Sequence, residues 1–290
     1  MRTPAHLTTA PSTRRARMPR ACALPSRAGG AYIRPEPAWS PPVIHLLALV
    51  RWTALGVTLL FLVPLALAAL WWALQDRPAS WSMADWGPSG VLPAASAVPG
   101  AAIHVLAART GGLKGAASVH SWIVWKRPGA RARSRADVVG WGRPLRRDAY
   151  APDGRWFSNA PLVVGSVEGA EAARLVPALE AAIDGYPWGG PGSYRIWPGP
   201  NSNTFVAHVL REVPGIGATL PPHAVGKDWI GPGLTAVRDA GGDLHLSAWG
   251  YLGLSVGPRS GIELNLLGQA VGLDLAHPAL KLPGIGRLGA

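Results

Sequence analysis

The sequence predicts an α+β fold in which one N-terminal transmembrane helix precedes a globular domain with a β-rich C-terminal part. Residues 52–74 form an apolar run without a charged side chain. Beyond this run, glycine and proline separate short apolar segments, which is typical of strands joined by tight turns. Residues 168–183 instead repeat apolar side chains every four positions, which is typical of a helix.

The N-terminal tail is strongly basic. Residues 1–51 hold eight arginines against one acid, Glu36, and this balance of +7 is most of the formal net charge of +12. The single cysteine, Cys22, also lies there, so a disulfide framework in the domain is excluded. We expect residues 1–43 to form a disordered cytoplasmic tail that starts at Met1 or Met18.

The apolar run is long enough to cross a bilayer. At about 1.5 Å per residue, residues 52–74 reach roughly 34 Å, against a hydrocarbon core of about 30 Å. Trp52, Trp71 and Trp72 lie at its ends, where aromatic anchors are common. We therefore assign residues 44–75 to a transmembrane helix and expect the lipid bilayer to be the partner of residues 52–74.

Flanking charge gives the orientation of this helix. Because the arginines precede it, the positive-inside rule places the tail in the cytoplasm and the domain outside. We expect a single-pass protein of the inner (plasma) membrane with a periplasmic domain. Ala66-Leu67-Ala68 resembles a signal-peptide cleavage site, but apolar residues continue beyond it, so we expect the anchor to be retained.

A linker and a sheet follow the anchor. Residues 76–99 are rich in Pro, Ser and Gly, and predict a linker to a domain over residues 100–290. β-Rich runs at 101–109 and 116–126 flank Thr110-Gly111-Gly112 and predict a hairpin. The other predicted elements are a strand at 137–141, a polar connection at 149–159, a helix at 168–183 that is either continuous or divided at Pro177, a helix ending at Leu210, and strands at 244–249, 252–256 and 262–267.

Several common sites are absent from the sequence. It has no GxxxxGKS/T phosphate loop, no GxGxxG after a strand and no HExxH. The eight histidines are scattered without cysteine partners, so we expect no metal and no cofactor. The domain has one basic cluster, which we interpret as a solvated hairpin rim, with contact to anionic lipid or an acidic envelope polymer as the alternative. Its members are Lys126, Arg127, Arg131, Arg133, Arg135, Arg143, Arg146 and Arg147, and we expect no nucleic-acid partner.

The most specific candidate site is the segment Pro200–Phe205, which opens the second helix. One reading is that Asn201 or Ser202 only caps this helix. The other is that Ser202 is a nucleophile at a position where free backbone amides stabilise an oxyanion. A serine nucleophile needs a base, and His120, within an apolar strand, is the best candidate. Asp137 on the next strand is placed to orient His120, as the third member of a triad does.

Other polar residues are candidates with structural alternatives. Lys227 is an alternative base for Ser202, and otherwise forms an ordinary surface pair with Asp228. Glu263 and Asn265 alternate onto one face of a predicted strand, where they either line a pocket or face solvent. The candidate ligand-binding residues are Asn201, Asn203, Trp122, Asp228, Glu263 and Asn265.

The order of the catalytic candidates resembles the permuted papain-like proteins, which include lecithin:retinol acyltransferase and the PPPDE peptidases and are related to NlpC/P60 proteins. In that group a histidine on an early strand precedes a polar orienter and then a cysteine in an Asn-Cys-x-x-Phe context. This chain has His120, Asp137 and the run Asn201–Phe205, with serine in place of cysteine. The resemblance implies a small antiparallel sheet with helices. Because a serine hydroxyl is less acidic than a cysteine thiol, it also implies that Ser202 needs a general base.

A closer resemblance covers nearly all of residues 101–289. Its segments are 119–124, 138–142, 197–205, 224–228, 263–268 and 281–286. Together they look like an uncharacterised bacterial family of membrane-anchored proteins, the domain-of-unknown-function family DUF3750. This resemblance implies a bacterial membrane protein but no activity.

Two functions of different classes follow from these observations. The first is a serine-type hydrolase or acyl transferase that acts on an amide or ester of the cell envelope, with Ser202 as nucleophile, His120 as base and Asp137 as orienter. The second is a non-catalytic envelope binding or scaffold module on a papain-like frame. Neither the substrate nor the oligomeric state follows from the sequence.

Overall fold

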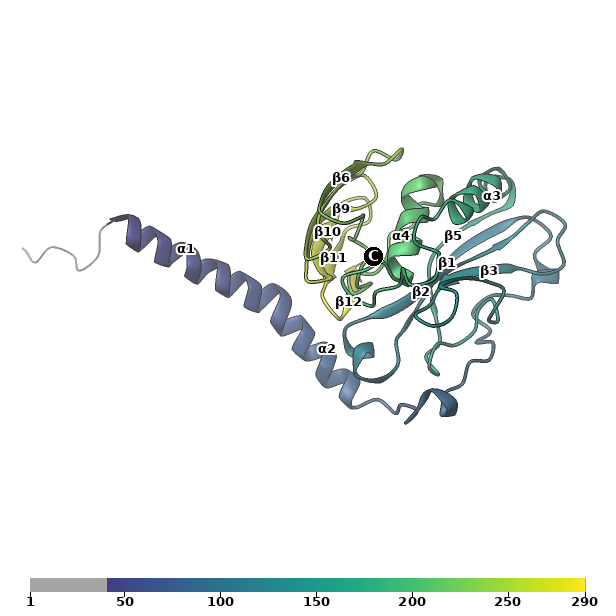
Figure 1. Cartoon of the computed structure of the whole chain (residues 1–290), viewed down its shortest axis with the longest axis horizontal. Coiled ribbons are helices and arrows are strands. Elements are labelled where there is room, and N and C mark those ends of the chain that lie inside the picture. Colours follow the sequence, from purple (N-terminus) through teal and green to yellow (C-terminus); the bar gives the residue numbers. More distant parts are fainter. Residues whose placement is uncertain (1–40, 290) are drawn as a thin grey trace, which may run out of the picture. The chain divides into compact units, whose positions relative to one another are not determined.

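The structure is a computed structural model that describes residues 41–289. The expected basic tail, residues 1–43 with Cys22 and Met18, lies outside the described residues except for its last three positions. The described chain has one long apolar helix followed by two antiparallel sheets and the helices α3 and α4 (Figure 1). The predicted α+β fold class is therefore confirmed.

The apolar helix begins earlier than its apolar run. Helix α1 (Pro41–Val57), a π-helical turn (Thr58–Leu62) and helix α2 (Val63–Ala73) follow one another directly. Residues Pro42–Ala73 are long and apolar enough to cross a membrane. Pro64 lies in the first turn of α2, directly after the wider π-helical turn, which accommodates a proline ring more easily than a regular turn does.

The predicted hairpin lies at the centre of a five-stranded sheet of order β4-β3-β2-β1-β5. Its outer strands β4 and β5 are not among the predicted elements. The strands are β1 (Ala102–Arg109), β2 (Val119–Lys126), β3 (Ser134–Val138), β4 (Leu145–Arg147) and β5 (Leu162–Glu168). Short 3-10 turns lie at Trp81–Met83, Ala95–Ala97, Gly112–Ala116 and Pro214–Ile216.

Two helices cover one face of this sheet. Helix α3 (Gly169–Asp184) is continuous through Pro177, which is the first of the two alternatives for this segment. Helix α4 (Ser202–Glu212) packs on β2 and β3. Their apolar faces enclose the main core with strand side chains such as Ile123. The opposite face of the sheet carries a smaller core, which includes Trp122 and Trp156.

The C-terminal part forms a seven-stranded meander in which every strand pairs with the next. The strands predicted at 244–249, 252–256 and 262–267 are present, and four more lie beside them. The strands are β6 (Leu234–Arg238), β7 (Leu244–Ala248), β8 (Leu252–Gly257), β9 (Gly261–Leu266), β10 (Gln269–Asp274), β11 (Ala279–Leu282) and β12 (Gly286–Gly289). Helix α4 lies between the two sheets (Figure 1).

The interpretation of the basic cluster as a solvated rim is wrong for two of its members. Lys126 is buried, and its ammonium group donates to the carbonyl of Gly100. Arg135 is also buried, with its guanidinium 4.2 Å from the ring centroid of Trp122. Both cations lose contact with water because the chain before β1 and the residues after β4 cover this face of the sheet.

Candidate functional site

A cavity of about 420 Å³ lies at the N-terminus of α4, where β2 begins. It contains both His120 and Ser202 in its lining. Five aromatic side chains form much of the remaining wall: Trp141, Trp156, Phe157, Tyr194 and Trp197. The structure therefore brings the predicted base and the predicted nucleophile to one concave, largely aromatic site.

Ser202 is the first residue of α4. The side chain of Asn201 caps the helix by accepting the backbone N–H groups of Asn203 and Thr204, and the Thr204 hydroxyl accepts the N–H of Asn201 in return. This capping box fixes the helix start beside the cavity. Because the cap uses two amides of the first turn, the amide of Ser202 is the one left at this end to contact an oxyanion.

Ser202 is only 4% exposed, and its hydroxyl makes no hydrogen bond within the described residues. The neighbouring Asn203 is bound on three sides. Its amide nitrogen donates to the carbonyls of Val119 and Val225, and its oxygen accepts the Ser121 hydroxyl at 2.8 Å. Asn203 therefore fastens the start of α4 to the start of β2.

His120 lies on the other side of β2 from these contacts. Since side chains alternate along a strand, Ser121 points toward α4 and the His120 ring points away from it. The ring stacks on Trp156, with centroids 3.6 Å apart and planes at 6°. His120 and Ser202 line one cavity at the end of the sheet, but no hydrogen bond joins them.

The third predicted catalytic residue does contact His120. The Nε2 atom of His120 lies 3.4 Å from Oδ2 of Asp137, and the Arg135 guanidinium donates to the same oxygen at 2.7 Å. Asp137 is 1% exposed, so its interpretation as a solvating charge at a strand edge is wrong. Burial alone would raise the pKa of Asp137, but the hydrogen bond from His120 and the charge of Arg135 outweigh burial and lower it.

This contact sets the state of the imidazole. Burial lowers the pKa of His120 below its ordinary value, although the bond and charge of Asp137 act in the opposite direction. A neutral ring with its proton on Nε2 donates to Asp137 and leaves the lone pair on Nδ1. Nδ1 makes no hydrogen bond within the described part of the chain, so it is available to a ligand.

Two of the predicted ligand-binding residues offer the cavity no free polar group. The Asn201 amide nitrogen donates to the carbonyls of Ile196 and Val225. Trp122 is fully buried in the smaller core, and its indole N–H donates to the carbonyl of Pro152. Asn201 lines the cavity together with Asn203, whereas Trp122 is not part of the lining.

The alternative base Lys227 lies at a different place. It lines a cavity of about 70 Å³ between α4 and the seven-stranded sheet, together with Asp228, Glu263 and Asn265. Lys227 and Asp228 are both buried, which contradicts their interpretation as a surface pair. Glu263 pairs with Lys227 at 2.7 Å and with Lys281 at 3.1 Å. The structure thus joins Lys227 to Glu263 and does not bring it to Ser202.

Asp228 is the unusual member of this cluster. Neither of its carboxylate oxygens has a hydrogen-bond partner among the described residues, and burial raises its pKa to about 6. Asn265 has one orphaned side-chain atom, its amide oxygen, while its nitrogen lies 3.4 Å from Glu263. These residues face a space of about 70 Å³, which has room for several water molecules. We therefore describe the cluster as a buried polar core between α4 and the seven-stranded sheet.

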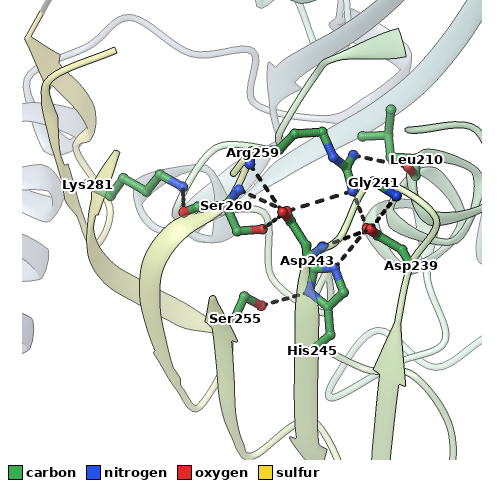
Figure 2. Close-up of polar contacts among 9 residues, drawn as sticks. All are labelled: Leu210, Asp239, Gly241, Asp243, His245, Ser255, Arg259, Ser260 and Lys281. Carbon is green, nitrogen blue, oxygen red and sulfur yellow. Dashed lines mark hydrogen bonds and ion pairs between the residues drawn. The ribbon is translucent and has the colours of Figure 1, made fainter. Parts of the chain in front are cut away.

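A third polar cluster lies at the turn between β6 and β7 (Figure 2). Asp239, Asp243 and His245 each place one potential metal-ligand atom within 4.8 Å of the others. The guanidinium of Arg259 contacts both carboxylates, and the ring of His245 bonds Asp239 and Ser255. Because other protein groups already bond these ligand atoms, we interpret the cluster as one that stabilises the turn.

Sequence reasoning missed the aromatic wall of the main cavity. Trp141, Trp156 and Tyr194 come from irregular connections, and their positions depend on tertiary packing. The nearest signal is the frequency of tryptophan, with 14 in the chain, and the sequence gives no way to tell which of them gather at one site.

Comparison with known proteins shows that part of this chain is similar to one family model. Residues 100–229 match a family described as a protein of unknown function (DUF3750), as the resemblance implies. The match covers the five-stranded sheet, α3, α4 and every residue that lines the aromatic cavity, and it ends before β6. Neither a curated protein nor a solved structure matches the chain.

Proposed function

We propose that this domain of a family of unknown function is a ligand-binding module of the bacterial cell envelope, and that the apolar helix anchors it to the inner membrane. The cavity at the start of α4 is the observation that carries the proposal. Its walls are mostly aromatic, and two polar groups in it, the Ser202 hydroxyl and His120 Nδ1, have no partner among the described residues. Apolar walls with few polar groups are typical of small-molecule sites.

The lining also suggests the chemistry of the ligand. Lys114 is the one lysine of the lining, which contains no carboxylate and no arginine. An aromatic or apolar body would pack against Trp141 and Trp156, while an anionic or hydrogen-bond-accepting group would meet Lys114 and Ser202. We therefore expect an amphiphilic ligand with a carboxylate, phosphate or similar head.

A small aromatic acid tests this proposal. The full chain in lipid nanodiscs is mixed with 2-naphthoate, and binding is followed by saturation-transfer NMR with empty nanodiscs as reference. Trp141 is 42% exposed at the cavity, so Trp141→Ala should preserve the fold and weaken binding several-fold. Trp81, which is 54% exposed and lies outside the cavity, provides the control variant Trp81→Ala. Equal binding by the two variants, or no binding above empty nanodiscs, would contradict the proposal.

A serine-type hydrolase or acyl transferase is the second candidate. It is favoured by the presence of Ser202 and His120 in one cavity and by the contact of His120 Nε2 with Asp137. In such a reaction Ser202 Oγ attacks the carbonyl carbon of an amide or ester as His120 Nδ1 accepts its proton. The amine or alcohol leaves with that proton, and water or another acceptor then takes the acyl group. The papain-like order of residues supports the same assignment.

Labelling with a fluorophosphonate separates the two candidates. If Ser202 is a nucleophile, the full chain should be labelled, Ser202→Ala should not be, and Ser118→Ala should be labelled as before. Because burial lowers the pKa of His120, labelling should stay constant near neutral pH and fall only in acid, below about pH 6.5. Absence of labelling across a panel of such probes would contradict the hydrolase or acyl transferase, and the binding module would be the remaining candidate.

We also propose the orientation and limits of the parts. The eight arginines before residue 52 favour a cytoplasmic N-terminus and a periplasmic domain. Residues 76–99 would then be the linker, and residues 100–290 the periplasmic domain.

A further inference from the structure

The seven-stranded sheet is apolar on its exposed face. Two cross-strand rows show this pattern most clearly. One row runs through Leu244, Val256, Ile262, Leu273, Leu280 and Leu288, and the other through Leu246, Leu254, Leu264 and Val271. The first row is exposed throughout, as are the three leucines of the second. We call these ten residues the apolar face.

The buried face of the same sheet is polar. The row between the two apolar rows contains His245, Ser255, Glu263 and Lys281, and it faces α4 and the small polar cavity. Antiparallel sheets of water-soluble domains place apolar residues inward and polar residues outward. This sheet has the reverse arrangement, which is the arrangement of strands that face lipid.

The size of the apolar face is also unusual for a surface in water. From the exposed fractions of its ten residues it presents roughly 700 Å², whereas the largest apolar patch of a soluble monomer is typically about 300–600 Å². Arg238, at the β6 edge, is the one charged side chain in register with either row, where it pairs with Leu244. A surface of this kind needs an apolar neighbour.

We propose that the apolar face lies against the lipid bilayer and that the domain is seated on the membrane through it, in addition to the apolar helix. The position of the apolar helix supports lipid as the neighbour of the apolar face. Leu67, Ala68 and Trp71 of α2 line a cavity with Gly284 and Ile285, in the turn between β11 and β12. The end of the apolar helix thus contacts the edge of the same sheet, so lipid around the helix is the nearest apolar phase.

Aromatic side chains at one end of the sheet also support contact with lipid. Trp249 and Tyr251 are about half exposed at the turn between β7 and β8, and Trp197 packs on Tyr251 with centroids 4.9 Å apart. Tryptophan and tyrosine are enriched where a protein meets the headgroup layer. A second copy of the chain would also cover the apolar face, and the experiment below distinguishes it from lipid.

Site-specific fluorescence tests this placement in the full chain. In a Cys22→Ser background, single cysteines at Leu254→Cys and Leu264→Cys are labelled with an environment-sensitive dye. The chain is reconstituted in vesicles of phosphatidylcholine and phosphatidylglycerol. Ala178→Cys, on the exposed side of α3, is the matched control. Spin-labelled lipid should quench the dye at 254 and 264 at least threefold more than at 178, and aqueous iodide should do the reverse.

Two other results would overturn the proposal. Strong iodide quenching at all three positions would show that the apolar face is open to water. Protection of 254 and 264 from both quenchers would show that protein covers the face, and disulfide cross-linking between two Leu254→Cys chains would identify a second copy. Thermal unfolding of each labelled variant establishes that it is folded. None of these results depends on a ligand in the aromatic cavity, so the binding proposal is tested separately.

Discussion

At the scale of single residues, burial determines the chemistry of the titratable groups. His120 is kept neutral by burial, and Asp137 is kept ionised by His120 and Arg135 in spite of burial. The pair therefore presents an acceptor atom, Nδ1, in a mostly apolar cavity. Asp228 is the opposite case, because burial raises its pKa and no side chain among the described residues donates to its carboxylate.

Asp228 makes the stability of the protein depend on pH. The unfolded chain loses this proton near pH 3.8 and the folded chain near pH 6, so the free energy of unfolding falls as pH rises through that window. The difference corresponds to about 3 kcal/mol. Asp228→Asn should therefore raise the free energy of unfolding at pH 7.5 by up to that amount and change it little at pH 4, in urea titrations of the full chain.

The opposite result would assign Asp228 a different role. If Asp228→Asn lowers stability at pH 7.5, the carboxylate has a partner in solution, such as a bound cation or ordered water.

At the scale of elements, the start of α4 depends on a glycine in the loop that covers it. Gly226 has φ +91°, and a Cβ there would lie 2.4 Å from Nδ2 of Asn201, the capping residue. Gly226→Ala should therefore displace the cap and destabilise the fold by more than the strain of positive φ alone. Gly217→Ala is the matched control, since Gly217 has φ +71° and nothing within 4 Å of its Cβ position.

Chemical denaturation measures the free energy of unfolding of both variants. We expect Gly217→Ala to cost about 1 kcal/mol and Gly226→Ala to cost about 2 to 4 kcal/mol. Equal losses would mean that the loop moves aside and that the cap does not depend on it.

The elements also show how far the sequence could be interpreted. Periodicity located the hairpin, α3 and three strands of the second sheet, because their apolar residues repeat regularly. It missed β4, which has three residues, and β5, an edge strand interrupted by Gly165. Pro177 did not divide α3, because tertiary packing of Val176 and Leu179 outweighs one lost hydrogen bond.

The candidate site was only partly predictable for a related reason. The sequence order placed His120 beside Asp137 and Ser202 at a helix start, and both placements are found. Strand β2 is buried on both faces, so its apolar pattern does not show which face His120 occupies. The sequence pattern of the second sheet likewise shows alternation without showing that the apolar side is the uncovered one.

At the scale of the whole molecule, the orientation of the chain can be tested directly. Alkaline phosphatase fused after Gly289 should be active in a bacterial host if the domain is periplasmic, because this enzyme needs disulfides that form outside the cytoplasm. Replacing the arginines at positions 14, 15, 17 and 20 with glutamate should lower that activity. Green fluorescent protein is fused at the same position in a second chain. If that chain fluoresces and the phosphatase fusion is inactive, the proposed orientation is contradicted.

One side chain belongs to two surfaces of the molecule. Trp197 lines the aromatic cavity, and it also packs on Tyr251 and donates to the carbonyl of Leu267 at the end of the second sheet. If that end rests among lipid headgroups, the mouth of the cavity opens onto them. A ligand could then arrive by lateral diffusion within a leaflet, which confines the search to two dimensions and favours molecules that already reside in the membrane.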